Sequence, residues 1–217
     1  MSSAPHGAPT SSGSVETVAP SGTGPRESSL ISALRLATRD AHERLETALP
    51  LTDPRLGCDE YRVVVEAFHG FYVPLESRLA GVAPTGGAPA HERGKLARLR
   101  ADLLALGTSE AGIDALPLCP TVPELATPGA ALGCRYVVEG ATLGGRVIVH
   151  ALAKHLGLGP TTGAAFFEGY GVESATRWAS FRVELDASPW PWTETLAAAL
   201  ATFVDLERWL RARGALR

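Results

Sequence analysis

The chain has 217 residues, of which 45% are hydrophobic and 20% are charged, and this is enough apolar material for one sizeable core. The formal net charge of -3 shows no basic excess of the kind that a general nucleic-acid binder carries. The chain contains no run of about 18 or more apolar residues, so no membrane span is predicted. The three cysteines, Cys58, Cys119 and Cys134, form no CxxC pair, which predicts neither a zinc site nor a disulfide framework. The chain also lacks a secretory signal pattern, so we expect a reducing, cytoplasmic location.

The first residues differ sharply in composition from the rest. Residues 1–27 are dominated by Ser, Pro, Gly and Thr and have almost nothing to bury, so we expect a disordered tail. Residues 28–217 should then form a single folded domain. Apolar residues recur there at steps of three and four, and no alternating strand pattern of useful length appears. The chain is therefore predicted to be all-α.

The first predicted helix covers residues 30–48, with Ser28 or Ser29 as its N-cap and Pro50 after its end. A second begins near Asp59 and should kink near Gly70 and Pro74. An exposed helix is predicted over 91–106, and the capping-box pattern at 121–124 predicts another helix start. The later helices are expected at 130–156, 172–185 and 192–213.

One histidine lies beside the apolar stripe of the first helix. His42 follows Arg39 by three residues and Arg35 by seven, so at about 100° per residue all three project from nearly the same face. The rise of the helix puts the two arginines about 5 Å and 10 Å further toward its N-terminus. This pattern suits a flat cofactor with a metal at its centre and carboxylates at its edge. The alternative is a surface helix with an ordinary histidine and solvated arginines.

A glycine-rich stretch interrupts the helix predicted over 130–156. Each glycine inside a helix costs about 0.5–1 kcal/mol relative to alanine. Gly133, Gly140 and Gly144 are spaced by seven and four, so they should form one bare strip of backbone that a flat group can approach closely, and that also permits a bend. The alternative is close packing of helices through small residues. A phosphate loop is not indicated, because no strand precedes the glycines.

These residues together resemble the haem oxygenase family. The segment LRLATRDAHERLE (34–46) is similar to that family's proximal helix, YVVEGATLGGR (136–146) to its distal helix, and FHGFYVPLE (68–76) to its second helix. The resemblance extends from about residue 29 to the C-terminus. It is closest to the bacterial branch that supplies biliverdin to bacteriophytochromes, which makes an apo-bacteriophytochrome a candidate acceptor of the product.

The resemblance implies a helical domain that holds haem b, both substrate and cofactor, between a proximal and a distal helix. His42 would be the axial ligand of the haem iron, and Arg35, Arg39 and Arg177 would lie near the propionates. Gly140 and Gly144 would form the catalytic, distal side, with room for dioxygen. The implied reaction opens the ring to biliverdin, carbon monoxide and ferrous iron, with electrons from an external ferredoxin or flavoprotein reductase.

The chain departs from the best-known members of that family at one distal position. They carry an aspartate directly after the first distal glycine, where this chain has Ala141, and Glu139, Thr142 and Arg146 are the polar residues nearby. Alanine cannot anchor a water network, so a haem carrier or sensor without turnover is the first alternative. The ExxH pair Glu66 and His69 suggests a second alternative, a di-iron oxidase, although no second ExxH follows.

Overall fold

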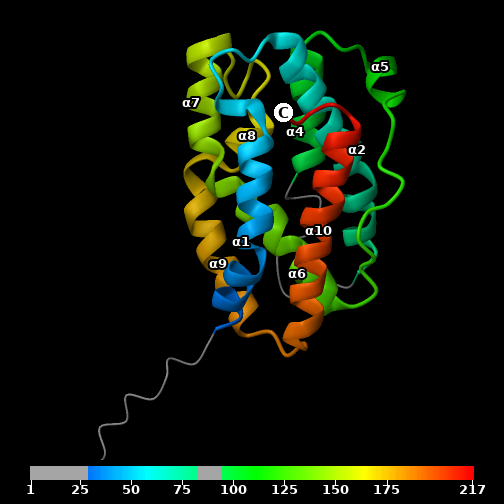
Figure 1. Ribbon diagram of the computed structural model, residues 1–217, viewed down its shortest axis with the longest axis vertical. Coiled ribbons are helices and arrows are strands. Elements are labelled where there is room, and N and C mark those ends of the chain that lie inside the picture. The colour runs from blue at the N-terminus through cyan, green and yellow to red at the C-terminus, as the bar shows by residue number, and fades with distance from the viewer. Residues whose placement is uncertain (1–28, 83–93) are drawn as a thin grey trace, which may run out of the picture.

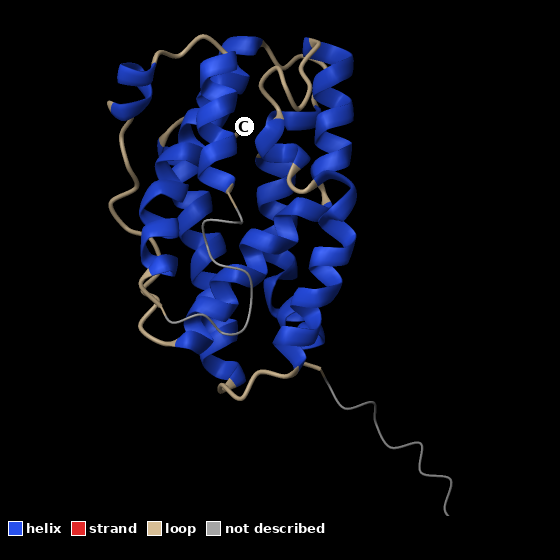
Figure 2. Ribbon diagram, turned by 180° about the vertical axis from the view of Figure 1, so that it is seen from behind, coloured by secondary structure: helices blue, strands red, loops and turns tan. Residues whose placement is uncertain are grey.

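Helices and the turns between them make up the computed structural model, which describes residues 29–82 and 94–217 (Figure 1, Figure 2). The all-α prediction is confirmed for these residues, none of which lies in a strand. The predicted tail, Ser28 and the start of the helix expected at 91 lie outside the described residues. The longer helices are α1 (Leu30–Ala48), α2 (Cys58–Ala80), α4 (Lys95–Ala105), α6 (Pro128–Gly140), α7 (Gly145–Leu156), α9 (Ser174–Asp186) and α10 (Trp192–Ala212). The short ones are α5 (Glu110–Asp114) and α8 (Ala165–Glu168), with 3-10 turns η1 (Pro50–Thr52), η2 (Ala141–Leu143) and η3 (Gly171–Glu173).

Helix α1 follows the sequence pattern closely. Ser29 is its N-cap, because the backbone N–H of Ser32 donates to Ser29 Oγ at 3.3 Å, and the helix ends two residues before Pro50. Its apolar stripe is buried against α9 and α10. The residues beside that stripe remain exposed, and they include His42, which still contacts Phe203 of α10.

Helix α10 packs against α1, α2 and α6. Its closest contact is with α6, where a Cβ on Gly133 would lie 2.1 Å from the carbonyl oxygen of Thr195. Thr195 is buried at this approach, and Leu200 on the same helix is exposed. Close packing of backbone against backbone therefore decides which side of α10 faces α6.

The helix start predicted at 121–124 is wrong. Arg78 Nη1 donates hydrogen bonds to the carbonyl oxygens of Val122 (2.6 Å) and Pro123 (3.0 Å), and these residues lie in an irregular, largely buried segment. Helix α6 begins later, after Thr127, whose Oγ1 accepts a backbone N–H three residues further on at 3.1 Å. A tertiary contact from α2 thus overrides the local capping pattern.

The prediction that the third helix is exposed is also wrong. Lys95 and Asp102 are both buried on α4. The Asp102 carboxylate accepts the backbone N–H groups of Ala165 (2.7 Å) and Phe166 (2.8 Å), so it satisfies the first turn of α8. Burial raises the pKa of Asp102, and the two hydrogen bonds oppose that shift.

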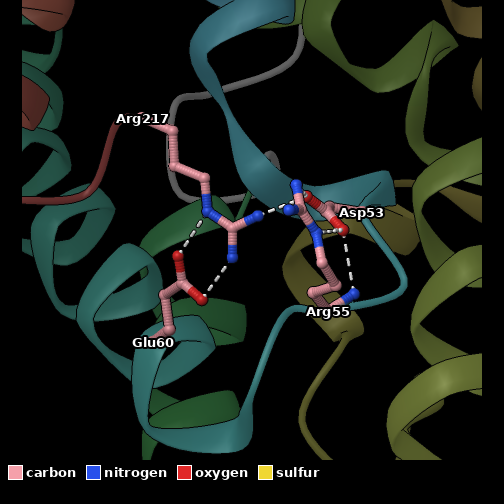
Figure 3. A network of polar contacts seen from close by, with 4 residues as sticks. All are labelled: Asp53, Arg55, Glu60 and Arg217. Atoms are coloured by element: carbon pink, nitrogen blue, oxygen red, sulfur yellow. Dashed lines mark hydrogen bonds and ion pairs between the residues drawn. The ribbon is translucent and has the colours of Figure 1, made fainter.

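A cluster of ion pairs fastens the C-terminal segment beside the loop between α1 and α2 (Figure 3). Arg217 donates to both carboxylate oxygens of Glu60, at 2.7 and 2.6 Å, and pairs with Asp53. Arg55 also pairs with Asp53, and hydrogen bonds from Arg55 hold the pKa of that carboxyl well below its usual range. The backbone N–H of Arg217 donates to the carbonyl oxygen of Ala48 at 2.9 Å, which ties the end of α1 to the same cluster.

Within residues 29–82 and 94–217, no helix has the length and apolar character needed to cross a bilayer.

Candidate functional site

The imidazole of His42 is accessible on the outer side of α1. Its side chain is 60% exposed, and Nδ1 lies 3.5 Å from Oε2 of Glu46, one turn further along the helix. The ring edge contacts Phe203 of α10, with ring centroids 6.1 Å apart and an interplanar angle of 78°. The pair between Nδ1 and Glu46 directs Nε2 away from Glu46. A carboxylate on one ring nitrogen is how ligating histidines are commonly oriented toward a metal.

Arg35 and Arg39 are exposed on the same helix. Helical geometry puts both on the His42 side of α1, toward its N-terminus. Two guanidinium groups on one side of an accessible imidazole can bind carboxylates at the edge of a flat ligand.

The glycine-rich stretch contains the predicted bend, which the structure confirms. Helix α6 ends at Gly140, η2 follows, and α7 begins at Gly145. The φ angles of Gly140 (-60°) and Gly144 (-79°) are ones that any residue adopts, so the backbone there does not require glycine. Gly144 instead borders open space, because a Cβ on this residue would have no heavy atom within 4 Å. Leu143 and Val147 beside it are 45% and 67% exposed, which makes this an open apolar strip.

Other glycines of the stretch serve close packing instead. A Cβ on Gly145 would lie 1.8 Å from the carbonyl oxygen of Phe167, just as Gly133 has no room against α10. At Gly140 a Cβ would lie 3.7 Å from the indole of Trp178 on α9. The prediction of one bare strip over Gly133, Gly140 and Gly144 is therefore wrong for Gly133, which serves close packing, and of the three only Gly144 has open space beside it. The approach of a flat group to Gly144 stays a prediction.

One helix contacts both α1 and the glycine break. Helix α9 packs against α1 and against η2, and α10 packs against α1 and α6 (Figure 1). The helix that carries His42 and the segment next to Gly144 therefore share α9 as a neighbour, although about a hundred positions separate them in the sequence.

Arg177, the third predicted cation, is engaged on α9. Its Nε donates to Glu173 Oε2 at 2.9 Å, and its guanidinium lies 4.5 Å from the centre of the Tyr170 ring. Its approach to a propionate stays a prediction.

A buried polar cluster lies directly before the glycine break, and the sequence did not reveal it. Lys95 (4% exposed) and Glu139 (7% exposed) form an ion pair, with Nζ 3.4 Å from Oε1. The Tyr170 hydroxyl lies 3.3 Å from the same carboxylate oxygen and 3.5 Å from the ammonium group. Burial lowers the pKa of Lys95, and burial together with the Glu139 charge raises the pKa of Tyr170.

This cluster shows which of the polar residues near Ala141 are internal. Thr142 is buried and its Oγ1 donates to the carbonyl oxygen of Glu139 at 2.7 Å, whereas Ala141 and Arg146 are exposed. One signal in the sequence could have found the cluster: Lys95 precedes Leu99 by one helical turn, so a charge lies on an apolar stripe.

The described residues contain no group of three or more His, Cys, Asp and Glu side chains that could hold a metal ion. His69, half of the ExxH pair, is buried, its Nδ1 lacks a hydrogen-bond partner, and burial lowers its pKa. In this structure His69 is a core residue of α2.

The sequence profile described as Heme oxygenase matches residues 28–211. The chain belongs to the haem oxygenase family. Among solved structures, a heme oxygenase from Leptospira interrogans shares the fold with a TM-score of 0.71 and 20% identity, over 85% of this chain and 99% of that chain. Heme oxygenase-1 from the cyanobacterium Synechocystis sp. PCC6803, solved in complex with heme, gives a TM-score of 0.64 and 16% identity, over 85% of this chain and 91% of that chain. No curated protein sequence matches at a significant level. Family and fold are therefore established together.

Proposed function

We propose that this member of the haem oxygenase family binds haem b and cleaves it oxidatively to biliverdin, carbon monoxide and ferrous iron. One observation carries the proposal: an exposed imidazole, oriented by a carboxylate, lies on a helix that shares its neighbour α9 with an open, apolar glycine break. The family supports the reaction class.

The residues present fit a flat, apolar, dicarboxylate ligand. The open strip at Gly144 and its exposed flanking Leu143 and Val147 offer apolar surface that a porphyrin would cover. Exposed arginines on the His42 side of α1 offer charge for two carboxylates. When bound, haem would supply both the iron that activates dioxygen and the ring that is oxidised.

In this proposal the side chains of α1 hold the ligand. His42 Nε2 would ligate the iron while Glu46 orients the ring through Nδ1. Arg35 and Arg39 would pair with the propionates. Gly140 and Gly144 would keep the distal side narrow enough to exclude bulk water and wide enough for dioxygen. An imidazole ligand carries no negative charge, so it would donate less electron density to a bound iron than a thiolate does.

A haem carrier or sensor is the second candidate, because Ala141 is exposed and cannot anchor a water in the distal space. The Glu139 carboxylate is already committed to Lys95 and Tyr170. Turnover would then depend on hydrogen bonds from backbone groups and waters at the glycine break.

The proposal needs an electron donor, which we take to be a ferredoxin or a flavoprotein reductase. The described cysteines are free thiols, which suits a reducing compartment such as the cytoplasm. An apo-bacteriophytochrome is the proposed acceptor of biliverdin, on the resemblance to that bacterial branch alone.

The test adds hemin to the purified protein and then ascorbate, or ferredoxin with its reductase, in air. A Soret band that decays into the broad red absorbance of biliverdin supports the enzyme. A Soret band that persists under reductant supports the carrier or sensor, and no Soret band at all contradicts both.

A further inference from the structure

Trp178 covers one end of the glycine break and leaves the other end open. Its Cη2 and Cζ3 atoms lie 3.7 Å from where a Cβ on Gly140 would be, which is ordinary van der Waals contact. Nothing lies within 4 Å of the corresponding position on Gly144. A flat ligand over this strip therefore meets the indole at the Gly140 end and free space at the Gly144 end.

The indole of Trp178 is held in place by two neighbouring aromatic rings. Its ring centroid lies 5.8 Å from that of Tyr136 and 5.8 Å from that of Phe181, at interplanar angles of 47° and 41°. Phe181 is buried in turn, and the Arg135 guanidinium lies 4.9 Å from its ring centre. Arg135 also pairs with Glu184 through Nη2, at 2.8 Å from Oε2. A side chain packed against two aromatic rings in this way has few rotamers open to it.

We propose that Trp178 is a fixed wall that sets the in-plane position of the porphyrin and so determines which meso carbon is oxidised. This inference rests on the proposed function. The wall confines the ring to the Gly144 end of the break, so one edge of the porphyrin rests against the indole. The meso carbon exposed to the distal side then depends on how far the ring can slide toward Gly140. Trp178 is a positioning residue, since it acts through the seating of the ring.

The test compares Trp178→Ala with Trp178→Phe, which keeps an aromatic ring in the stack. Trp178→Leu serves as a second removal that retains apolar volume, and Trp192→Phe at the exposed start of α10 is the control. Two quantities are measured: the proton NMR shifts of the haem methyl groups in the ferric, cyanide-bound complex, and the biliverdin isomers separated by chromatography. The NMR measurement needs no turnover. Circular dichroism checks that each variant is folded.

We expect the Ala and Leu variants to show a shifted or doubled set of haem methyl signals, while the two Phe variants match the wild type. The isomer ratio should change by roughly tenfold or more, since apolar pockets discriminate by about 10–200-fold for a single methylene. Unchanged methyl shifts and an unchanged isomer ratio in both the Ala and the Leu variant would refute the proposal that Trp178 sets the position of the porphyrin. Tighter hemin binding with unchanged shifts would also overturn it, because the indole would then occupy the site only in the empty protein. If the wild type binds no hemin, the proposed function fails and this inference fails with it.

Discussion

The ion pair between Lys95 and Glu139 is buried beside the glycine break. Removing one of its two partners should lower the free energy of unfolding substantially. Both residues are almost fully buried, so Lys95→Met leaves a carboxylate without its counter-charge. Breaking a buried pair from one side costs about 3–5 kcal/mol. A domain of this size loses about 2–4 °C in Tm per kcal/mol, so the variant should melt roughly 6–20 °C lower.

The double variant Lys95→Met with Glu139→Gln removes both charges and keeps an oxygen that accepts a hydrogen bond from Tyr170. Its free energy of unfolding should exceed that of Lys95→Met alone, because no buried charge remains unpaired. Arg100→Met is the matched control on the same helix, since Arg100 pairs with the exposed Asp114 (2.9 Å) and Glu110, and solvent screens exposed pairs so that they contribute little to stability.

Urea denaturation followed by circular dichroism measures the wild type, these three variants and the single variant Glu139→Gln. The reasoning would be refuted if Lys95→Met cost no more than the control. It would be refuted equally if the double variant lost the sum of the two single losses, since the two charges would then not be coupled.

Three further predictions concern packing, pH and ligand binding. Gly145→Ala should lower the free energy of unfolding by about 1–3 kcal/mol or more, because its Cβ would lie 1.8 Å from a backbone oxygen of α8; a loss below about 0.5 kcal/mol in urea denaturation would contradict this contact. Burial raises the pKa values of Tyr72 and Tyr170, so the unfolded phenols lose protons near pH 10 while the folded ones keep them. The stability from these groups is present below about pH 10 and is lost as the pH rises further, and a phenolate absorbance showing both groups ionised at pH 10 in the folded protein would disprove it. Arg35→Ala with Arg39→Ala should weaken hemin binding, since each charge-assisted contact is worth about 1.5–3 kcal/mol; an unchanged Kd would exclude the propionate role.

The sequence predicted those parts of the fold that depend on local periodicity. Helix α1 with its Ser29 cap, and α10 with its start at Trp192, lie where the apolar spacing put them. The bend in the glycine stretch was also foreseeable, because glycines concentrate there at a cost to the helix.

The parts that were missed depend on partners far apart in the sequence. Lys95 is buried because Glu139, 44 residues later, lies opposite it, and the apolar stripe on which Lys95 lies does not identify that partner. The capping box at 121–124 failed because the guanidinium of Arg78 takes the carbonyl groups of that segment. The role of Trp178 depends likewise on its contact with Gly140 on another helix.

The proposed function depends on His42 as the ligand of the haem iron. The most direct measurement adds hemin and ascorbate in air to the wild type and to His42→Ala, with and without added imidazole. We expect the wild type to convert the Soret band into biliverdin absorbance and His42→Ala to fail to do so. Added imidazole should restore part of the conversion in the variant, because it replaces the missing ligand. Conversion by His42→Ala at the wild-type rate without imidazole would contradict the role of His42 as the iron ligand.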